Sequence, residues 1–210
     1  MNIRSNPFDN AIAIAYSSAF DSMPSAIKDI FIAISGFGDK GVFFIIVGIL
    51  LLFFAKTRKI GLTCLIAALL TLIFNDLIFK NIFDRARPFQ DPNLVTQLQA
   101  VVNNNGLPYG IIPDSTSFPS GHSFTAFAAI GGLASLLVFD KDERKSYIAP
   151  LILFSIVGII IASSRILLSH HYFTDVLAGC SLGLLFGFTT YFIIKYGDKL
   201  LKFIKTKLQK

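Results

Sequence analysis

Apolar runs of nearly bilayer length recur along the chain and constrain its fold more than any other feature. Five of them lie at residues 39–55, 60–79, 120–139, 147–168 and 173–194. At a rise of about 1.5 Å per residue, most of these runs are long enough to cross a hydrocarbon layer of about 30 Å as helices. A soluble domain of 210 residues would not carry several such runs, so we predict an all-α integral membrane helical bundle.

The region before the first long run is predicted to form short helices rather than a span. Residues 8–36 alternate brief apolar stretches with Asp21, Pro24, Lys28 and Asp29. This pattern favours two interfacial or re-entrant helices, and a sixth span is an open alternative. We therefore expect five to six transmembrane helices in a single domain over residues 1–210, with interfacial helices within residues 1–36.

The net charge of +6 is concentrated after the last apolar run. Six lysines lie between Lys195 and Lys210, directly behind the last predicted span. This position predicts a basic tail at 195–210 that faces anionic lipid headgroups, rather than a surface for nucleic acid. Cys64 and Cys180 both lie inside apolar runs, so they indicate neither a disulfide framework nor a metal site. The pattern makes no prediction about oligomeric state.

The placement of lysine and arginine predicts the orientation of the chain in the plasma membrane. Basic residues fill the connections at 56–59 and 141–145 as well as the C-terminal tail. With five spans these segments lie on one side, which the positive-inside rule assigns to the cytoplasm. The segments 80–87 and 165–171 and the loop at 89–118 then face the outside. A loop of this length is often a lid or a binding element, and a disordered connector is the alternative.

Three short polar clusters interrupt the apolar runs. They comprise Lys80 with Arg87-Pro88, then Pro119-Ser120-Gly121-His122, and then Ser164-Arg165 with His171 and Asp175. Cations, a Ser-Gly turn rich in backbone donors, two imidazoles and a carboxylate can together hold a phosphoryl group, attack it and protonate the leaving oxygen. Because only 15% of the residues are charged, the grouping of these side chains beside apolar runs indicates one phosphate-handling site.

The first cluster supplies two cations. Lys80 and Arg87 are seven residues apart, so both project from the same side if one helix continues through them. Pro88 discourages that continuation, and Asp76 is placed to pair with Lys80 four residues later. The alternative is that these cations, with Arg85, only anchor a helix end in the headgroups. Such anchors belong mainly on the cytoplasmic side, which disfavours this alternative.

The second cluster marks the start of an apolar helix. Ser120 occupies an N-cap position, and Gly121 lets the backbone approach a ligand closely. The exposed amides and the positive dipole end of such a helix favour an anion, which His122 would face from the first turn. An ordinary N-cap is the alternative when this cluster is considered alone.

The third cluster pairs an imidazole with a carboxylate. His171 and Asp175 are four residues apart, so they share a helix face and can hydrogen-bond. A carboxylate that holds one ring nitrogen leaves the other as an oriented nucleophile or base. Arg165 offers a planar fork for phosphate oxygens, whereas His170 points elsewhere and is expected to be interfacial or secondary. A zinc site is the alternative; the converging cations oppose it, so neither a metal nor a cofactor is expected.

The three clusters resemble the three-part signature of the type 2 phosphatidic acid phosphatase superfamily. Its parts read Lys-x6-Arg-Pro, Pro-Ser-Gly-His and Ser-Arg-x5-His-x3-Asp, and every position is present here in the same order. The resemblance implies that His171 is a nucleophile forming a phosphohistidine, that Asp175 orients it, and that His122 is the general acid. It implies a phosphate cradle made of Lys80, Arg87, Ser120, Gly121 and Arg165. Members of this superfamily need no metal, in agreement with the electrostatic argument.

The resemblance also implies a membrane enzyme that hydrolyses a lipid phosphate or diphosphate at the outer face. We expect undecaprenyl diphosphate first, converted to undecaprenyl phosphate, because the small size, compact loops and outward site are similar to those of bacterial undecaprenyl diphosphate phosphatases. Phosphatidylglycerophosphate, phosphatidic acid and a lipid A phosphate are alternatives. The apolar runs disfavour a soluble vanadium haloperoxidase. An anion channel or transporter is disfavoured because the interiors of the last three runs are uncharged.

Overall fold

The computed structural model describes residues 3–37, 41–98 and 116–208, which form helices and no β-strand. The longer helices are α1 (Pro7–Asp21), α2 (Ser25–Phe37), α3 (Val42–Leu52), α4 (Arg58–Leu70), α6 (Gly121–Phe139), α7 (Ile148–Leu167), α8 (Phe173–Gly187) and α9 (Thr190–Leu208). The short helical segments are η2 (Ala55–Thr57), η3 (Thr71–Phe79), α5 (Lys80–Ile82), η4 (Pro88–Gln90), η5 (Val95–Gln97) and η7 (Arg144–Tyr147). The predicted all-α class is confirmed.

Four helical stretches of the described chain are long and apolar enough to cross a membrane, namely Ala55–Ile82, Gly121–Phe139, Arg144–Leu167 and Phe173–Leu201. They agree with four of the five predicted spans. The run at 39–55 corresponds to the 11-residue helix α3, which at about 1.5 Å per residue is shorter than the hydrocarbon layer. Residues 38–40, from which that span would have gained length, lie outside the described residues. The N-terminal region forms the two short helices α1 and α2, as expected for residues 8–36.

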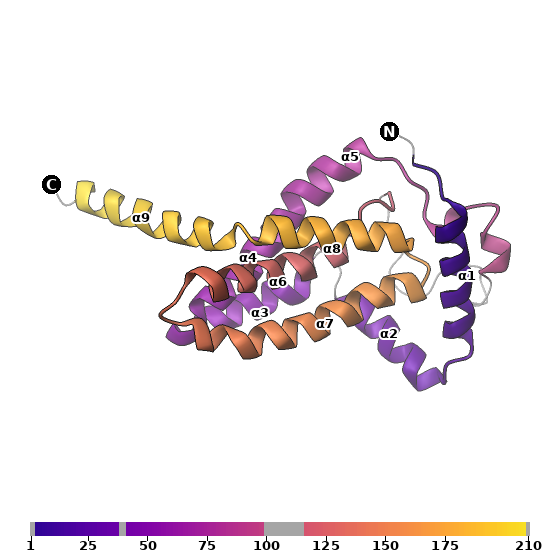
Figure 1. The fold of residues 1–210 in the computed structure, drawn as a ribbon, viewed down its shortest axis with the longest axis horizontal. Helices are drawn as coiled ribbons and strands as arrows, with labels where there is room; N and C mark the ends of the chain where they lie inside the picture. Colours follow the sequence, from indigo (N-terminus) through magenta and orange to yellow (C-terminus); the bar gives the residue numbers. More distant parts are fainter. Residues whose placement is uncertain (1–2, 38–40, 99–115, 209–210) are drawn as a thin grey trace.

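Helix α6 lies at the centre of the bundle, and α4, α7 and α8 pack around it (Figure 1). Of the most apolar 18-residue stretch of α6, 72% of the residues are buried. In the corresponding stretches of the other three spans the buried share is 33% or less. The outer helices expose large apolar side chains instead, and on α7 these recur every three or four residues at Ile148, Ile152, Ile156 and Ile159. Water would disfavour such a surface, so these faces are typical of helices surrounded by lipid.

Three glycines bring the backbone of α8 against that of α6. Gly179, Gly183 and Gly187 are spaced by four residues and therefore lie on one face of α8. A Cβ atom at Gly183 would lie 2.4 Å from the carbonyl oxygen of Phe124, and one at Gly187 would lie 2.1 Å from that of Ala128. No other residue fits at these two positions without displacing backbone, and small residues are what allow membrane helices to pack this closely.

The basic connections and the polar clusters lie at opposite ends of the bundle (Figure 1). At one end, Nζ of Lys59 lies 2.6 Å from Oδ2 of Asp140, so the α3–α4 and α6–α7 connections are adjacent. Helix α9 extends beyond the bundle from this end (Figure 1). At the other end, α1 runs across the bundle and packs against α7 and α8 (Figure 1). The fold therefore separates the two kinds of segment as the charge pattern predicts.

Candidate active site

Ser120 caps the N-terminus of α6, as predicted. Its side chain accepts a hydrogen bond from the N–H of Ser123 at 3.5 Å, and its own N–H donates to the carbonyl oxygen of Asp175 at 3.1 Å. The second bond ties the start of α6 to the first turn of α8. A Cβ atom at Gly121 would lie 3.8 Å from Nζ of Lys80, so this helix start is next to a cation. The first amides of a helix and its dipole both favour a bound anion.

Lys80 and Arg87 reach the site from different local structures. Lys80 follows the π-helical segment η3, and its Nζ lies 3.2 Å from Oδ1 of Asp76, so the predicted ion pair is confirmed. The helix ends at Ile82, and Arg87 has an extended backbone with φ −79° and ψ 158°. One helix therefore does not present both cations, because the backbone leaves the helix before it reaches Arg87.

Arg87 is buried beside His171. Its Nη1 donates to the carbonyl oxygen of His170 at 2.7 Å and lies 3.1 Å from Nε2 of His171. Its Nη2 donates to the carbonyl oxygen of Thr116 at 3.2 Å. Burial lowers the pKa of Arg87 to about 10, and the nearby Asp175 charge opposes this shift. The guanidinium is therefore still a cation at neutral pH, and its position is fixed by two backbone carbonyls.

The surroundings of His171 define which ring nitrogen carries the proton. Nδ1 lies 2.7 Å from the carbonyl oxygen of Ser117, which can only accept, so Nδ1 must donate. Nε2 then holds a lone pair, and it faces Nη1 of Arg87. Burial lowers the pKa of His171 well below its usual range, and so do the neighbouring cations Arg87, Arg165 and Lys80. The ring is therefore neutral at pH 7, which is the state that a nucleophile requires.

Asp175 is linked to His171 through Ser117 rather than directly. Its Oδ2 lies 3.8 Å from Nδ1 of His171, beyond hydrogen-bond distance. The same oxygen accepts from Oγ of Ser117 at 2.5 Å and from the N–H of Tyr172 at 2.9 Å. The predicted direct bond is therefore absent between these two side chains. The helical spacing does bring them together, but the ring nitrogen bonds to the nearer Ser117 carbonyl.

His122 and Arg165 meet at the C-terminal end of α2. Nε2 of His122 lies 3.0 Å from the carbonyl oxygen of Ser35, which accepts, so this nitrogen carries a proton. The guanidinium of Arg165 donates to the hydroxyl of the same serine. The Arg165 carbonyl oxygen accepts from the N–H of His171 at 3.2 Å, which places both groups next to the third cluster. One residue of α2 therefore engages a candidate proton donor and a candidate phosphate ligand together.

The fold brings all eight predicted site residues to one end of the bundle, namely Lys80, Arg87, Ser120, Gly121, His122, Arg165, His171 and Asp175. Three cations and a helix N-terminus there favour an anion. The described part of the chain holds no group of three or more His, Cys, Asp or Glu side chains placed to bind a metal ion. The site thus combines a cluster of cations, an imidazole lone pair and an imidazole proton.

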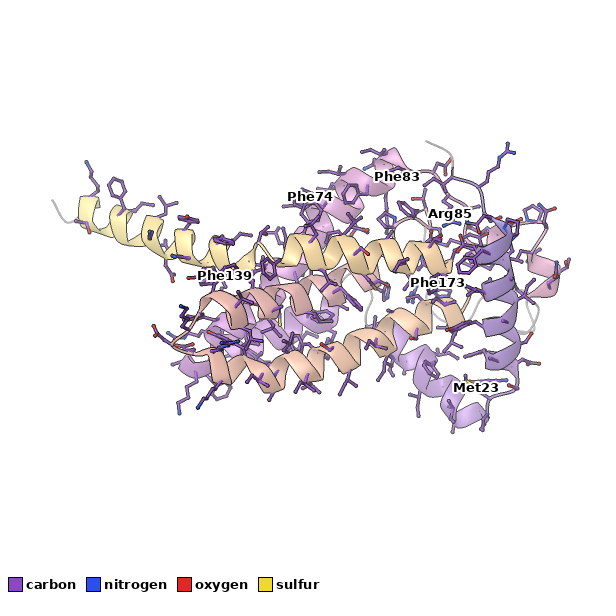
Figure 2. All side chains as sticks on the ribbon, in the orientation of Figure 1. Met23, Phe74, Phe83, Arg85, Phe139 and Phe173 are labelled. Carbon is purple, nitrogen blue, oxygen red and sulfur yellow. The ribbon has the colours of Figure 1, made fainter. Side chains whose placement is uncertain are left out.

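Four further residues were not predicted. Ser35, Ser117 and Arg85 contact the site directly, and Asp9 contacts Arg85. Arg85 is paired with Asp175 and, at 2.7 Å, with Asp9, and all three are buried. Figure 2 shows Arg85 at the end of the bundle where α8 begins and α1 crosses. Its place two residues before Arg87 was a usable signal, and so was the carboxylate of Asp9 in the first turn of an apolar helix. The two serines carry no comparable signal.

His170 fits the secondary rather than the interfacial place that was expected for it. It is completely buried, and its ring packs edge-on against Phe89 with 6.1 Å between the ring centroids. Its carbonyl oxygen accepts from Nη1 of Arg87, so its backbone contributes to the site.

These features define an all-helical, multi-pass membrane protein with a buried cluster of cations and histidines at one end of its bundle. The family model described as the PAP2 superfamily matches residues 59–198, which is more than half of the chain. The protein therefore belongs to the PAP2 superfamily, and the resemblance inferred from the three clusters is confirmed.

Several curated proteins are similar to this chain. It is 35% identical to phosphatidylglycerophosphatase B of Bacillus subtilis (strain 168) over 98 residues, which cover 44% of each chain. It is 28% identical to an undecaprenyl-diphosphatase of Sulfolobus acidocaldarius over 159 residues, or 76% of this chain and 66% of that one. It is 28% identical to a lipid A 4'-phosphatase of Porphyromonas gingivalis over 149 residues, which cover 69% of this chain and 57% of that one. These alignments span about half to two thirds of the relatives' own lengths.

A solved structure shares the fold. The crystal structure of the first transmembrane PAP2 type phosphatidylglycerolphosphate phosphatase from Bacillus subtilis matches with a TM-score of 0.64. The match covers 90% of this chain and 85% of that one, at 24% sequence identity. The arrangement of membrane helices is therefore common to both proteins.

Proposed function

We propose that this protein hydrolyses a lipid phosphate or diphosphate through a phosphohistidine on His171. One observation carries the proposal. His171 presents an unprotonated Nε2 beside Arg87, while His122 directs a proton at Ser35, a residue that also binds Arg165. A nucleophile and a proton donor in one cationic site are what phosphoryl transfer from a lipid requires.

The proposed reaction has two steps. First, Nε2 of His171 attacks the terminal phosphorus, and the bond from that phosphorus to the oxygen of the lipid alcohol or lipid phosphate breaks. His122, as the imidazolium, gives a proton to this leaving oxygen and becomes neutral. The Asp175 charge balances the positive charge that His171 then carries. Second, His122 takes a proton from water, the water oxygen attacks phosphorus, and the P–N bond breaks to release inorganic phosphate. The non-bridging oxygens are held throughout by the amides that begin α6 and by Lys80, Arg87 and Arg165.

Undecaprenyl diphosphate is the substrate that we propose first, with undecaprenyl phosphate as the lipid product. The undecaprenyl-diphosphatase of Sulfolobus acidocaldarius supports this choice, because its alignment covers 76% of this chain. The phosphatidylglycerophosphatase and the lipid A 4'-phosphatase support phosphatidylglycerophosphate and a lipid A phosphate as alternatives. Phosphatidic acid is a further alternative. All of them present a phosphate on an apolar anchor.

A phosphate-release panel on the purified protein tests this proposal. With EDTA present, kcat/KM for undecaprenyl diphosphate is expected to exceed that for the three alternative lipids by at least about tenfold, or about 1.4 kcal/mol in the barrier. EDTA is expected to leave the rate unchanged, because side-chain cations hold the phosphate. A preference for another lipid would reassign the substrate, and release from none of them would contradict the proposed activity. Chelator inhibition reversed by added metal would contradict the metal-free reaction.

We further propose that the site faces the outside of the plasma membrane and that the basic tail at 195–210 lies in the cytoplasm. The basic connections at the opposite end of the bundle support this orientation through the positive-inside rule. Helices α1 and α2 would then lie at the outer interface, where the loop at 89–118 also begins.

Thiol labelling on intact cells tests the orientation. Asn93 precedes η5 and Lys141 lies in the α6–α7 connection, and both are exposed. These two segments lie at opposite ends of the bundle (Figure 1). In a background with Cys64→Ala and Cys180→Ala, a membrane-impermeant thiol reagent is expected to label the Asn93→Cys variant and to spare the Lys141→Cys variant until the cells are lysed. The reverse pattern would invert the orientation.

A further inference from the structure

Asp9 connects α1 to the start of α8. It lies in the first turn of an apolar helix, yet its side chain is completely buried. Its Oδ2 accepts from Nη2 of Arg85 at 2.7 Å, from Oγ1 of Thr174 at 2.7 Å and from Nδ2 of Asn6 at 3.0 Å. Its Oδ1 accepts from the N–H of Thr174 at 3.1 Å. Burying a carboxylate is costly unless its oxygens are bonded, so this set of donors compensates for the burial.

Arg85 extends this contact to the proposed catalytic residues. Its side chain is only 2% exposed, and its guanidinium binds Asp9 through Nη2 and Asp175 through Nη1. The same Nη1 donates to Oγ1 of Thr174 at 2.8 Å. The guanidinium also lies over the ring of Tyr172, 4.2 Å from its centroid. Arg85 is thus held rigidly between a carboxylate on α1 and a carboxylate on α8.

The arrangement continues to His171 through Ser117. Oδ2 of Asp175 accepts from the Ser117 hydroxyl, and the Ser117 carbonyl oxygen accepts from Nδ1 of His171. The N–H of Ser117 donates to the carbonyl oxygen of Arg85 at 2.8 Å. Displacing Arg85 would therefore disturb both the carboxylate and the carbonyl that orient the imidazole.

We propose that Asp9 and Arg85 are positioning residues for His171, which makes α1 a functional part of the active site. This inference rests on the proposed function. The three-part signature leaves Arg85 unspecified, and the family match begins at residue 59, well after Asp9. Arg85 holds Asp175 in place, and Asp9 holds the other half of the guanidinium, so the carboxylate keeps a fixed position when His171 becomes positively charged. Neither residue touches the phosphate.

Two substitutions that each remove one charge test the pair. Asp9→Asn and Arg85→Gln are each expected to lower kcat by about 10- to 100-fold, because misplacing a reacting group by about 1 Å costs about that much. KM is expected to stay within about threefold, since the substrate contacts are intact. The kcat of the double variant is expected to be no more than about threefold below that of Arg85→Gln, because Asp9 acts through Arg85.

The pH dependence gives a readout that a loosened fold would not produce. The charged and titratable groups that face His171 are Arg87, Arg165, Lys80, His170, His122 and Asp175, and they are unchanged in both variants. Asp9→Asn removes a negative charge and is expected to move the acid limb of the pH profile of kcat/KM to lower pH. Arg85→Gln removes a positive charge and is expected to move it to higher pH, each by about 0.5 units. General loosening would not shift the two limbs in opposite directions.

Asp21→Asn is the matched control, since it makes the same change on the same helix. Asp21 has a side chain that is 66% exposed, and its partner Lys28 is 3.8 Å away, so activity is expected to be unchanged. If Asp9→Asn does not fold, the pair Arg85→Lys and Arg85→Gln carries the test. Lysine keeps the charge and is expected to recover about tenfold of the lost kcat.

The outcomes separate this inference from the proposed function. If the unmodified protein releases phosphate while Asp9→Asn and Arg85→Gln keep kcat within about threefold and the acid limb in place, the inference is wrong and the proposed function stands. If the unmodified protein releases phosphate from none of the lipids, both are wrong. Opposite shifts of the acid limb together with lowered kcat would establish the role of α1.

Discussion

The His171→Asn variant is expected to release no measurable phosphate, with kcat lowered by at least about 10³-fold. Asparagine can still donate to the Ser117 carbonyl but offers no lone pair where Nε2 of His171 now faces Arg87. Phosphorus then meets no nucleophile, although the cradle still binds the substrate. The measurement is inorganic phosphate release in multiple-turnover and single-turnover assays, with thermal unfolding in detergent to confirm that the variant is folded.

The neighbouring histidine provides a control. The ring of His170 packs against Phe89, so His170→Asn is expected to keep activity within about tenfold of the unmodified protein. Rapid quenching into alkali with phosphorus-labelled substrate is expected to trap label on the unmodified protein and on His170→Asn. No label is expected on His171→Asn. Substantial turnover by His171→Asn would show that another group attacks phosphorus.

The Gly183→Leu variant is expected to lose its native fold. A Cβ atom at this position would lie 2.4 Å from the Phe124 carbonyl oxygen, so α8 must move away from α6 before any further side-chain atom is placed. Overpacking of this kind costs about 3 kcal/mol or more, a large part of the stability of a domain. The start of α8 carries Asp175, so phosphate release is expected to be lost. The monodisperse gel-filtration peak of the unmodified protein is expected to be lost as well.

Gly197→Leu makes the same change on α9, where a Cβ atom meets nothing within 4 Å. This control is expected to fold, to unfold at an unchanged temperature and to retain full activity. If Gly183→Leu also behaved like the unmodified protein, the close contact between α6 and α8 would not be a requirement of the fold.

Features that depend on near neighbours in the chain were predictable from the sequence. Four spans followed from the length of apolar runs, the cap at Ser120 from the residue type before such a run, and the Asp76–Lys80 pair from a spacing of four. The three polar clusters could be combined because each lies beside an apolar run and charge placement puts them on one side. Local patterns of this kind carry their structural meaning within one or two helical turns.

The rest depends on contacts between distant parts of the chain. Asp9 meets Thr174 across 165 residues, and Ser35 meets Arg165 across 130, so no local pattern indicates either contact. The direct bond expected between His171 and Asp175 gave way to the Ser117 carbonyl, because helix spacing defines proximity and leaves the ring's partner open. Similarly, the early end of the helix at Ile82 placed Arg87 on extended backbone, although Pro88 had signalled a break.

The contact of Ser35 with both Arg165 and His122 has a consequence for binding. A phosphate that binds these two groups must exchange places with the end of α2. The affinity measured for the substrate is then lower than its intrinsic affinity, by the fraction of molecules in which the serine is displaced. After hydrolysis the same exchange runs in reverse. In the proposed reaction Ser35 would therefore act as a tethered competitor at a high effective concentration, and its return would help the cationic site to give up inorganic phosphate.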